Sequence, residues 1–255
     1  MVGNADLVGA GCALRQAAGE GDARALEHLL RTSGYDPADL LMLTDGDGTT
    51  ALMEAAMAGD HVDVMRLLLD HPCADAATIL MHATHLGFTA VIAAAVSGHV
   101  DVMRLLLTHP SADPAAMMAF NADIGESALV AAAVFATGGI AGDADDYEDA
   151  LPPSCAPLLF LLRRFAMQPQ PCDAQEAHMS KVMEVLMAGP RSGALFDDDQ
   201  PDDVRDECIR LLLEFGARGF DYNRPCVTRI VRDGLQMVQL LNEAVVGVAL
   251  AQQQH

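Results

Sequence analysis

The chain has 255 residues, a formal net charge of −21, a single lysine and no tryptophan. A charge this negative repels phosphate backbones and disfavours nucleic-acid binding, whereas it favours solubility and attraction to basic partners. An acidic surface that only prevents aggregation is the alternative interpretation. Half of the composition is apolar and rich in Ala, Leu and Met, so we expect an all-α protein. The longest apolar run, 128–136, is about half of the ~20 residues that a membrane span needs, so no membrane segment is predicted.

The six cysteines include no C-x-x-C pair, and several fall within apolar helical patterns. This distribution favours reduced, buried thiols in an intracellular protein over a disulfide framework or a zinc site. The first residues, MVGNADLVGAGCAL, lack the basic region and apolar block of a signal peptide. We therefore predict a cytoplasmic protein, with the nucleus as an alternative location.

The first predicted pair of helices lies at 12–30, in CALRQAAGEGDARALEHLL. The segment GYDPADLLMLT follows it and leads to the next pair. There Thr50 is a plausible N-cap for a helix in TALMEAAMAG, and Gly59 ends that helix because glycine permits the left-handed turn. The second helix of this pair, VDVMRLLL at 62–69, has apolar residues spaced to bury one face.

The next pair repeats the previous one almost residue for residue. The sequence HVDVMRLLL at 61–69 occurs again, unchanged, at 99–107, and shared helix propensity does not produce nine identical consecutive residues. The first-helix pattern at 47–59 is echoed at 86–98 and again at 124–136. Extra residues after each second helix, as in DAATILMHAT and DPAAMMAF, predict an additional helical turn.

Weaker copies extend the array toward the C-terminus. SKVMEVLMAG at 180–189 aligns with the first-helix pattern, and ECIRLLLEFGA at 207–217 aligns with the second. The last unit, roughly 225–251, is degenerate and is expected to cap the stack. A helix pair this small cannot bury its apolar face alone, so neighbouring pairs must supply the core.

This pattern resembles the ankyrin repeat, G-x-T-P-L-H-x-A-A-x-x-G-H-x-x-V-V-x-x-L-L. Residues 50–56 stand at T-P-L-H-x-A-A, and Gly98 with His99 matches the family's G-H. Alanine replaces the usual proline, and Met53, Ile92 and Val130 replace the usual histidine. The period is ~38 residues rather than the usual ~33.

The resemblance implies an all-α, ankyrin-type helical repeat solenoid of about six helix-turn-helix units. We expect one domain spanning 1–255, with approximate repeats at 7–43, 44–83, 84–121, 122–170, 171–219 and 220–251. No stretch remains for a separate catalytic domain of ~100 residues.

Acidic insertions interrupt the fourth and fifth repeats, GGIAGDADDYEDALPPS at 138–154 and PRSGALFDDDQPDD at 190–203. Both leave from the same kind of turn, so they are expected on the same edge of the solenoid. Three interpretations stay open: solvated loops without a ligand, an acidic lobe that attracts a basic partner, and a calcium site. The spacing lacks the glycine and terminal glutamate of an EF-hand loop.

Other chemistry-bearing residues lack the patterns of known sites. His71 and His109 each precede a proline and are expected to satisfy the last carbonyls of a helix. His82, His85 and Cys73 suggest a metal site, but their counterparts Phe120, Asp123 and Ser111 do not preserve it. No nucleophile motif or phosphate loop is present. We predict no enzyme, no metal and no cofactor.

The resemblance implies a module that binds a protein partner through its concave face, formed by turn tips and exposed positions of the first helices. Carried over by position, the candidate residues are Asp47, Thr49, Met57, His85, Leu86, Phe88, Val96, Ser97, Asp123, Ile124, Glu126, Val134 and Phe135. The apolar members would form a stripe suited to an interface, unless longer loops bury them as core. The protein is expected to be a monomer with an unknown protein partner. The alternative is an acidic regulatory inhibitor or chaperone that uses the insertions to hold a basic protein.

Overall fold

The computed structural model describes residues 4–59, 61–119, 127–136, 154–166, 181–182 and 203–214. Twelve helices have bounds in these ranges: α1 (Asn4–Gly19), α2 (Ala23–Thr32), α3 (Pro37–Leu41), α4 (Ala51–Ala58), α5 (Val62–Leu69), α6 (Ala76–Met81), α7 (Ala90–Val96), α8 (Val100–Thr108), α9 (Pro114–Ala119), α10 (Ala128–Ala136), α11 (Ala156–Ala166) and α13 (Asp203–Glu214). Within the same ranges, the only β pairing is an isolated bridge between Ala83 and Thr89. The predicted all-α repeat solenoid is confirmed.

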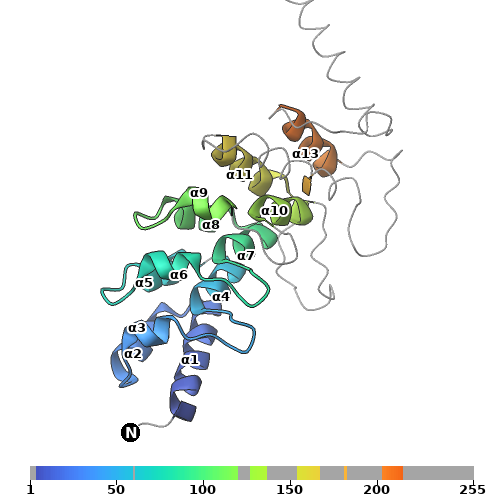
Figure 1. Ribbon diagram of the computed structural model, residues 1–255. Coiled ribbons are helices and arrows are strands. Elements are labelled where there is room, and N and C mark those ends of the chain that lie inside the picture. The colour runs from blue at the N-terminus through green and yellow to red at the C-terminus, as the bar shows by residue number, and fades with distance from the viewer. Residues whose placement is uncertain are drawn as a thin grey trace, which may run out of the picture.

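The first helices of successive repeats stack into one column. Helix α1 contacts α4, α4 contacts α7 and α7 contacts α10, and Figure 1 shows these four helices rising through the molecule in that order. Each first helix also contacts the second helix of its own repeat, as in α4 with α5 and α7 with α8. The core therefore runs along the stack instead of gathering at one centre.

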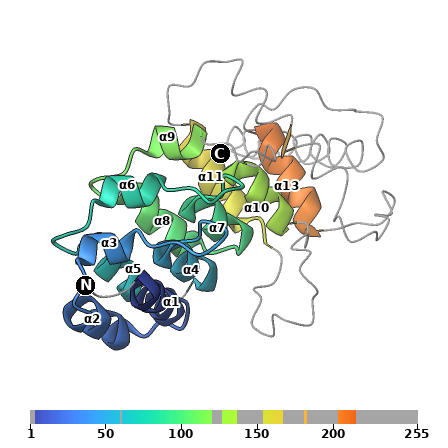
Figure 2. The ribbon, with the colours of Figure 1, turned by 60° about the horizontal axis from the view of Figure 1, so that its bottom comes forward.

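A short third helix completes each of the first three repeats. Figure 2 shows α3, α6 and α9 as a separate row beside the stack. An aspartate begins each one: Asp36 Oδ1 accepts a hydrogen bond from the Ala38 amide, Asp75 Oδ1 from Thr78, and Asp113 Oδ1 from Ala115 and Ala116. These carboxylates satisfy amides that a helix start leaves unpaired. The additional helical turn predicted after each second helix is confirmed.

The start of every first helix from α4 to α10 uses the same device. The hydroxyls of Thr50, Thr89 and Ser127 accept hydrogen bonds from the amides of the residues three positions later, each at 3.4 Å. All three caps are buried, with exposed fractions of 0%, 2% and 1%. Because a buried amide without a partner is costly, a hydroxyl is required at this position.

The turn between first and second helices requires glycine for a steric reason. Gly59 and Gly98 have φ angles of 86° and 82°, which side-chain-bearing residues rarely adopt. A Cβ on Gly59 would overlap the His99 ring, and one on Gly98 would overlap the Phe135 ring. His99 Nε2 also lies 3.0 Å from the Met57 carbonyl oxygen. Each of these two turns therefore has a ring from the next repeat placed directly on its glycine.

The two histidines that precede prolines act differently from the sequence-based expectation. His71 Nδ1 accepts a hydrogen bond from the Cys73 amide, and His109 Nδ1 accepts one from Ser111. These bonds order the turn after the helix, whereas we expected the rings to satisfy the helix's last carbonyls. His109 Nε2 lies 3.3 Å from Asp70 Oδ1, so it also ties the third repeat to the second.

Candidate functional site

The turn tip before α4 is held rigid by its first residue. The Asp45 carboxylate accepts hydrogen bonds from the amides of Asp47 at 2.9 Å and Thr49 at 2.8 Å. Burial alone would raise the pKa of Asp45, but the two amides and the nearby Arg15 outweigh it and hold the pKa below its ordinary value. The sequence DGDGT thus folds as a turn around one charged acceptor.

The next tip, before α7, has the same shape with a neutral acceptor. The Thr84 hydroxyl accepts a hydrogen bond from the Phe88 amide at 3.0 Å, while the Thr84 amide donates to the Phe88 carbonyl at 2.9 Å. Gly87, with φ of 80°, occupies the position that Gly48 occupies in the previous tip. A hydroxyl therefore replaces the carboxylate, and this tip is not anionic.

Neighbouring tips are joined into a continuous rim. The His85 amide donates to the Asp47 carbonyl at 2.9 Å, and His82 Nε2 lies 3.1 Å from the Gly48 carbonyl oxygen. A Cβ on Gly48 would approach the backbone of Thr84 and His85 at 3.1 Å, so the two tips are in close contact. The rim presents preformed positions for side chains, which reduces the ordering cost of binding.

Three charged residues, Arg15, Asp45 and Glu54, lie where this rim meets the first helices. Burial raises the pKa of Glu54, the charge of Asp45 raises it further, and Arg15 partly offsets both effects. The Arg15 guanidinium also lies 3.5 Å from the Leu43 carbonyl oxygen, which fixes it beside the first tip. This group places an acidic side chain on α4 that is half-buried and incompletely neutralised.

The predicted site residues in the second and third repeats remain accessible to different degrees. Met57 is 43% exposed and Leu86 is 60% exposed, and Asp47 and His85 are also exposed. Thr49, Phe88, Val96 and Ser97 are half-buried. Among the predicted site residues in the described ranges, Met57 and Leu86 are therefore the large apolar side chains that remain exposed.

The fourth repeat contributes less surface than the sequence pattern led us to expect. Phe135 is only 3% exposed because its ring covers the Gly98 turn, and Val134 is half-buried. Asp123, Ile124 and Glu126 lie outside the described residues. The expected apolar stripe thus narrows within the described residues to the second and third repeats, and Phe135 belongs to the packing between repeats.

The described residues contain no group of three or more His, Cys, Asp or Glu side chains that could hold a metal ion. Among the cysteines, burial raises the pKa of the Cys155 thiol, and the charge of Glu207 raises it further, which makes this thiol a weaker nucleophile. No helix in the described ranges has the length and apolar character needed to cross a membrane. The acidic residues of both insertions lie outside the described residues, except Asp203, which is the first residue of α13.

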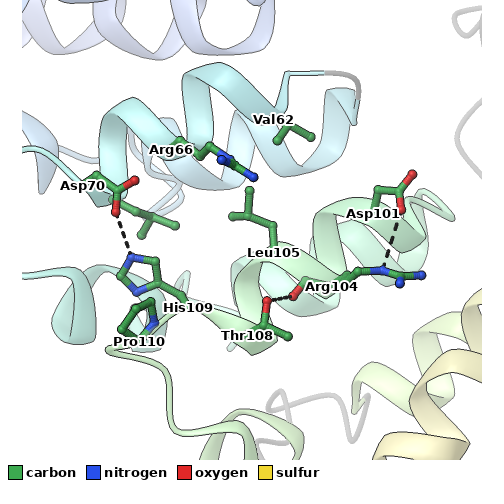
Figure 3. Close-up of a pocket in the computed structure, with 10 residues that line it drawn as sticks. Val62, Arg66, Asp70, Asp101, Arg104, Leu105, Thr108, His109 and Pro110 are labelled. Carbon is green, nitrogen blue, oxygen red and sulfur yellow. Dashed lines mark hydrogen bonds and ion pairs between the residues drawn. The ribbon is translucent and has the colours of Figure 1, made fainter.

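A second feature lies between the second helices of repeats two and three. A groove of about 510 Å³ lies between α5 and α8. Figure 3 shows Arg66 and Asp70 on one side of it and Arg104, Leu105 and His109 on the other. The sequence pattern did not indicate this groove. It also did not indicate the Arg15, Asp45 and Glu54 group, although one signal was available: Glu54 occupies a first-helix position where later repeats have Ala93 and Ala131.

Comparison with protein families identifies the repeat. Residues 14–118, from α1 to α9, match a family model described as ankyrin repeats, in three copies. No curated protein matches this sequence. The match ends before α10, so the continuation of the array through α10 and α11 rests on the stacking seen in the structure.

Proposed function

We propose that this chain binds a partner protein through the rim of turn tips at 45–49 and 84–88, together with the exposed side of α4. The chain belongs to the ankyrin-repeat family, whose members generally mediate protein–protein interactions. The observation that carries this proposal is the pair Met57 and Leu86, two large apolar side chains exposed on this face. Because both side chains are exposed, neither contributes to the buried core.

The chemistry of this face favours a partner segment that is apolar and basic. Apolar anchors supply most of the binding energy at interface centres, and Met adapts to irregular surfaces. Asp47 is exposed, and the Glu54 carboxylate has only Arg15 as a nearby opposite charge among the described residues. A basic group on the partner would neutralise the remaining negative charge near Glu54. It would also speed association, in keeping with the net charge of −21.

We propose a binding role without catalysis, in a protein that acts as a monomer. The rim's hydrogen bonds hold its backbone in place, while the side chains of Asp47, His85 and Leu86 are exposed to solvent. The alternative proposal is that the acidic insertions at 138–154 and 190–203 attract a basic protein.

The proposal is tested by capture from a native lysate with the full chain as bait, followed by mass spectrometry. Met57→Ser combined with Leu86→Ser should lower capture of the specific partner by tenfold or more, a loss of about 1.4 kcal/mol. Ala77→Ser combined with Ala115→Ser is the matched control, because both alanines are exposed on third helices. The control should capture the partner as the natural chain does.

The capture should also weaken as ionic strength rises from about 0.1 M to about 1 M, because the Debye length falls from ~10 Å to ~3 Å. If the serine pair on the rim leaves every captured protein unchanged while circular dichroism shows intact helices, this face is not the interface. Loss of capture in the alanine-to-serine control would point to a surface on the third helices instead.

A further inference from the structure

Helices α5 and α8 share the sequence VDVMRLLL, yet their arginines have different surroundings. Arg104 of α8 lies over the Phe160 ring of α11, with its guanidinium carbon 5.6 Å from the ring centroid. It also forms a long ion pair of 3.8 Å with Asp101, one turn earlier in the helix. The guanidinium of Arg104 therefore has an aromatic face from the next repeat beneath it.

The corresponding position in front of Arg66 holds a smaller side chain. The buried residues Met103 and Leu106 of α8 correspond to the buried Leu158 and Leu161 of α11, so Leu105 stands where α11 has Phe160. Arg66 thus meets Leu105 where Arg104 meets Phe160. Figure 3 shows Leu105 pointing from α8 toward α5, with Arg66 extending above it.

Leu105 and Arg66 both line a groove between α5 and α8. Its volume of 510 Å³ lies within the range of about 300–1,000 Å³ that is usual for ligand pockets. Val62, Leu69, Leu105 and Pro110 give it apolar walls. The lining residues come from α5, α8 and the turns after them, and none belongs to the turn tips at 45–49 and 84–88, so the groove is separate from the rim.

The other charged residues that line the groove form ion pairs or hydrogen bonds with one another and not with Arg66. At one end, His109 accepts from Ser111 through Nδ1, so its Nε2 carries the proton of the neutral ring and donates to Asp70. At the other end, Asp101 pairs with Arg104. Within the described residues, Arg66 is exposed and has neither an ion pair nor an aromatic contact.

We propose that this groove binds a partner segment that presents one aromatic side chain, which would lie on Leu105 beneath the Arg66 guanidinium. The argument is the internal comparison: the same helix in the next repeat uses a phenylalanine ring at this place. A cation over an aromatic face is attracted to it, whereas an aliphatic side chain offers only apolar contact. An acidic side chain would be attracted by Arg66 but repelled by the carboxylates of Asp70 and Asp101 at the ends of the groove.

The experiment titrates the full chain with capped pentapeptides of the form Gly-Gly-X-Gly-Gly, where X is phenylalanine, leucine or glutamate. Nuclear magnetic resonance follows the Arg66 side-chain Nε–H and the Leu105 methyl groups. The phenylalanine peptide should bind and shift both signals through its ring current. Arg66→Gln should weaken this binding about fivefold, as expected for a partly solvated cation–aromatic contact. Arg31→Gln is the matched control, because Arg31 is an exposed residue of α2 away from the groove, and it should leave the binding unchanged.

Leu105→Phe should abolish binding of the phenylalanine peptide because the new ring fills the groove from within. If that variant does not fold, the Arg66→Gln comparison still decides the question, since Arg66 is an exposed residue. Three results would overturn the proposal: no binding of the phenylalanine peptide, equal binding of the leucine peptide, or preferential binding of the glutamate peptide. Binding that Arg66→Gln leaves unchanged would place the peptide elsewhere and would overturn it as well.

Discussion

Helices α4 and α10 are the first helices of the second and fourth repeats, yet α4 keeps an exposed side whereas α10 is almost wholly buried. In α4, Glu54, Met57 and Ala58 stay outside the buried set, whereas in α10 every residue except Val134 is buried. Helix α4 contacts α1, α5 and α7, while α10 contacts α7, α11 and also α13. The comparison shows that one repeat pattern yields either a helix with an exposed side or an interior helix, according to what its neighbours cover.

The largest effect is expected when α10 is given the residue that α4 carries. Ala131 is the counterpart of Glu54 and is 0% exposed. Ala131→Glu would bury a carboxylate without a partner and overfill the interface, so it should lower the free energy of unfolding by about 4 kcal/mol or more. Chemical denaturation followed by circular dichroism measures this loss. The reverse change, Glu54→Ala, should alter stability by less than about 1 kcal/mol.

If Ala131→Glu unfolds at the same denaturant concentration as the natural chain, α10 has an accessible side and the contrast between the two helices fails. A similar loss in both variants would instead mean that Glu54 is a core residue. The pair of substitutions therefore separates a sealed fourth repeat from an open second repeat.

A smaller but still large effect is expected at Phe135. Its ring covers the Gly98 turn, so Phe135→Ala should leave a cavity between the third and fourth repeats and cost about 3 kcal/mol. Phe88, half-buried beside the rim, is the comparison, and Phe88→Ala should cost about half as much. Thermal unfolding of both variants checks the order. Equal or smaller destabilisation by Phe135→Ala would show that its ring is not part of the packing between repeats.

The contrast between Phe88 and Phe135 also shows what the sequence can and cannot predict. Local signals are strong: Thr50 caps a helix, Gly59 ends one, and identical nine-residue blocks establish the repeat. Those signals predict the helices, their pairing and the third-helix turns. They do not predict how much of a first helix the next repeat covers, because that depends on contacts between residues about 38 positions apart.

The same reason explains the features of the surface that sequence reasoning missed. Arg15, Asp45 and Glu54 come from three segments, and only the stacking of α1 on α4 brings their charges together. The groove between α5 and α8 has Leu105 in its lining at the position where α11 has Phe160, and this correspondence can be seen only once the helices are in register. Position in the repeat predicted which residues could face outward, whereas packing decided which of them do.

The smallest effect is expected from the charge of Glu54 on the open helix, and it depends on pH. The pKa of Glu54 is raised above 4.5 by burial and by Asp45, so the folded protein holds this proton more tightly than the unfolded chain does. The resulting stability is present below pH 4.5 and is lost as pH rises through the folded pKa. Glu54→Gln should therefore match the natural chain in acid and become more stable at neutral pH, by less than about 1 kcal/mol because solvent screens a half-exposed group.

Denaturant unfolding across this pH range measures the gap in stability between the natural chain and the Glu54→Gln variant, and Arg15 supplies the control. Since Arg15 partly offsets the raised pKa, adding Arg15→Gln to both proteins should raise the pKa of Glu54 further and widen that gap at neutral pH. A gap of the opposite sign at neutral pH, with the Glu54→Gln variant less stable than the natural chain, would mean that the folded protein favours the charged carboxylate. In that case Glu54 would already be neutralised by Arg15, and the open face would lack the unbalanced negative charge that favours a basic partner.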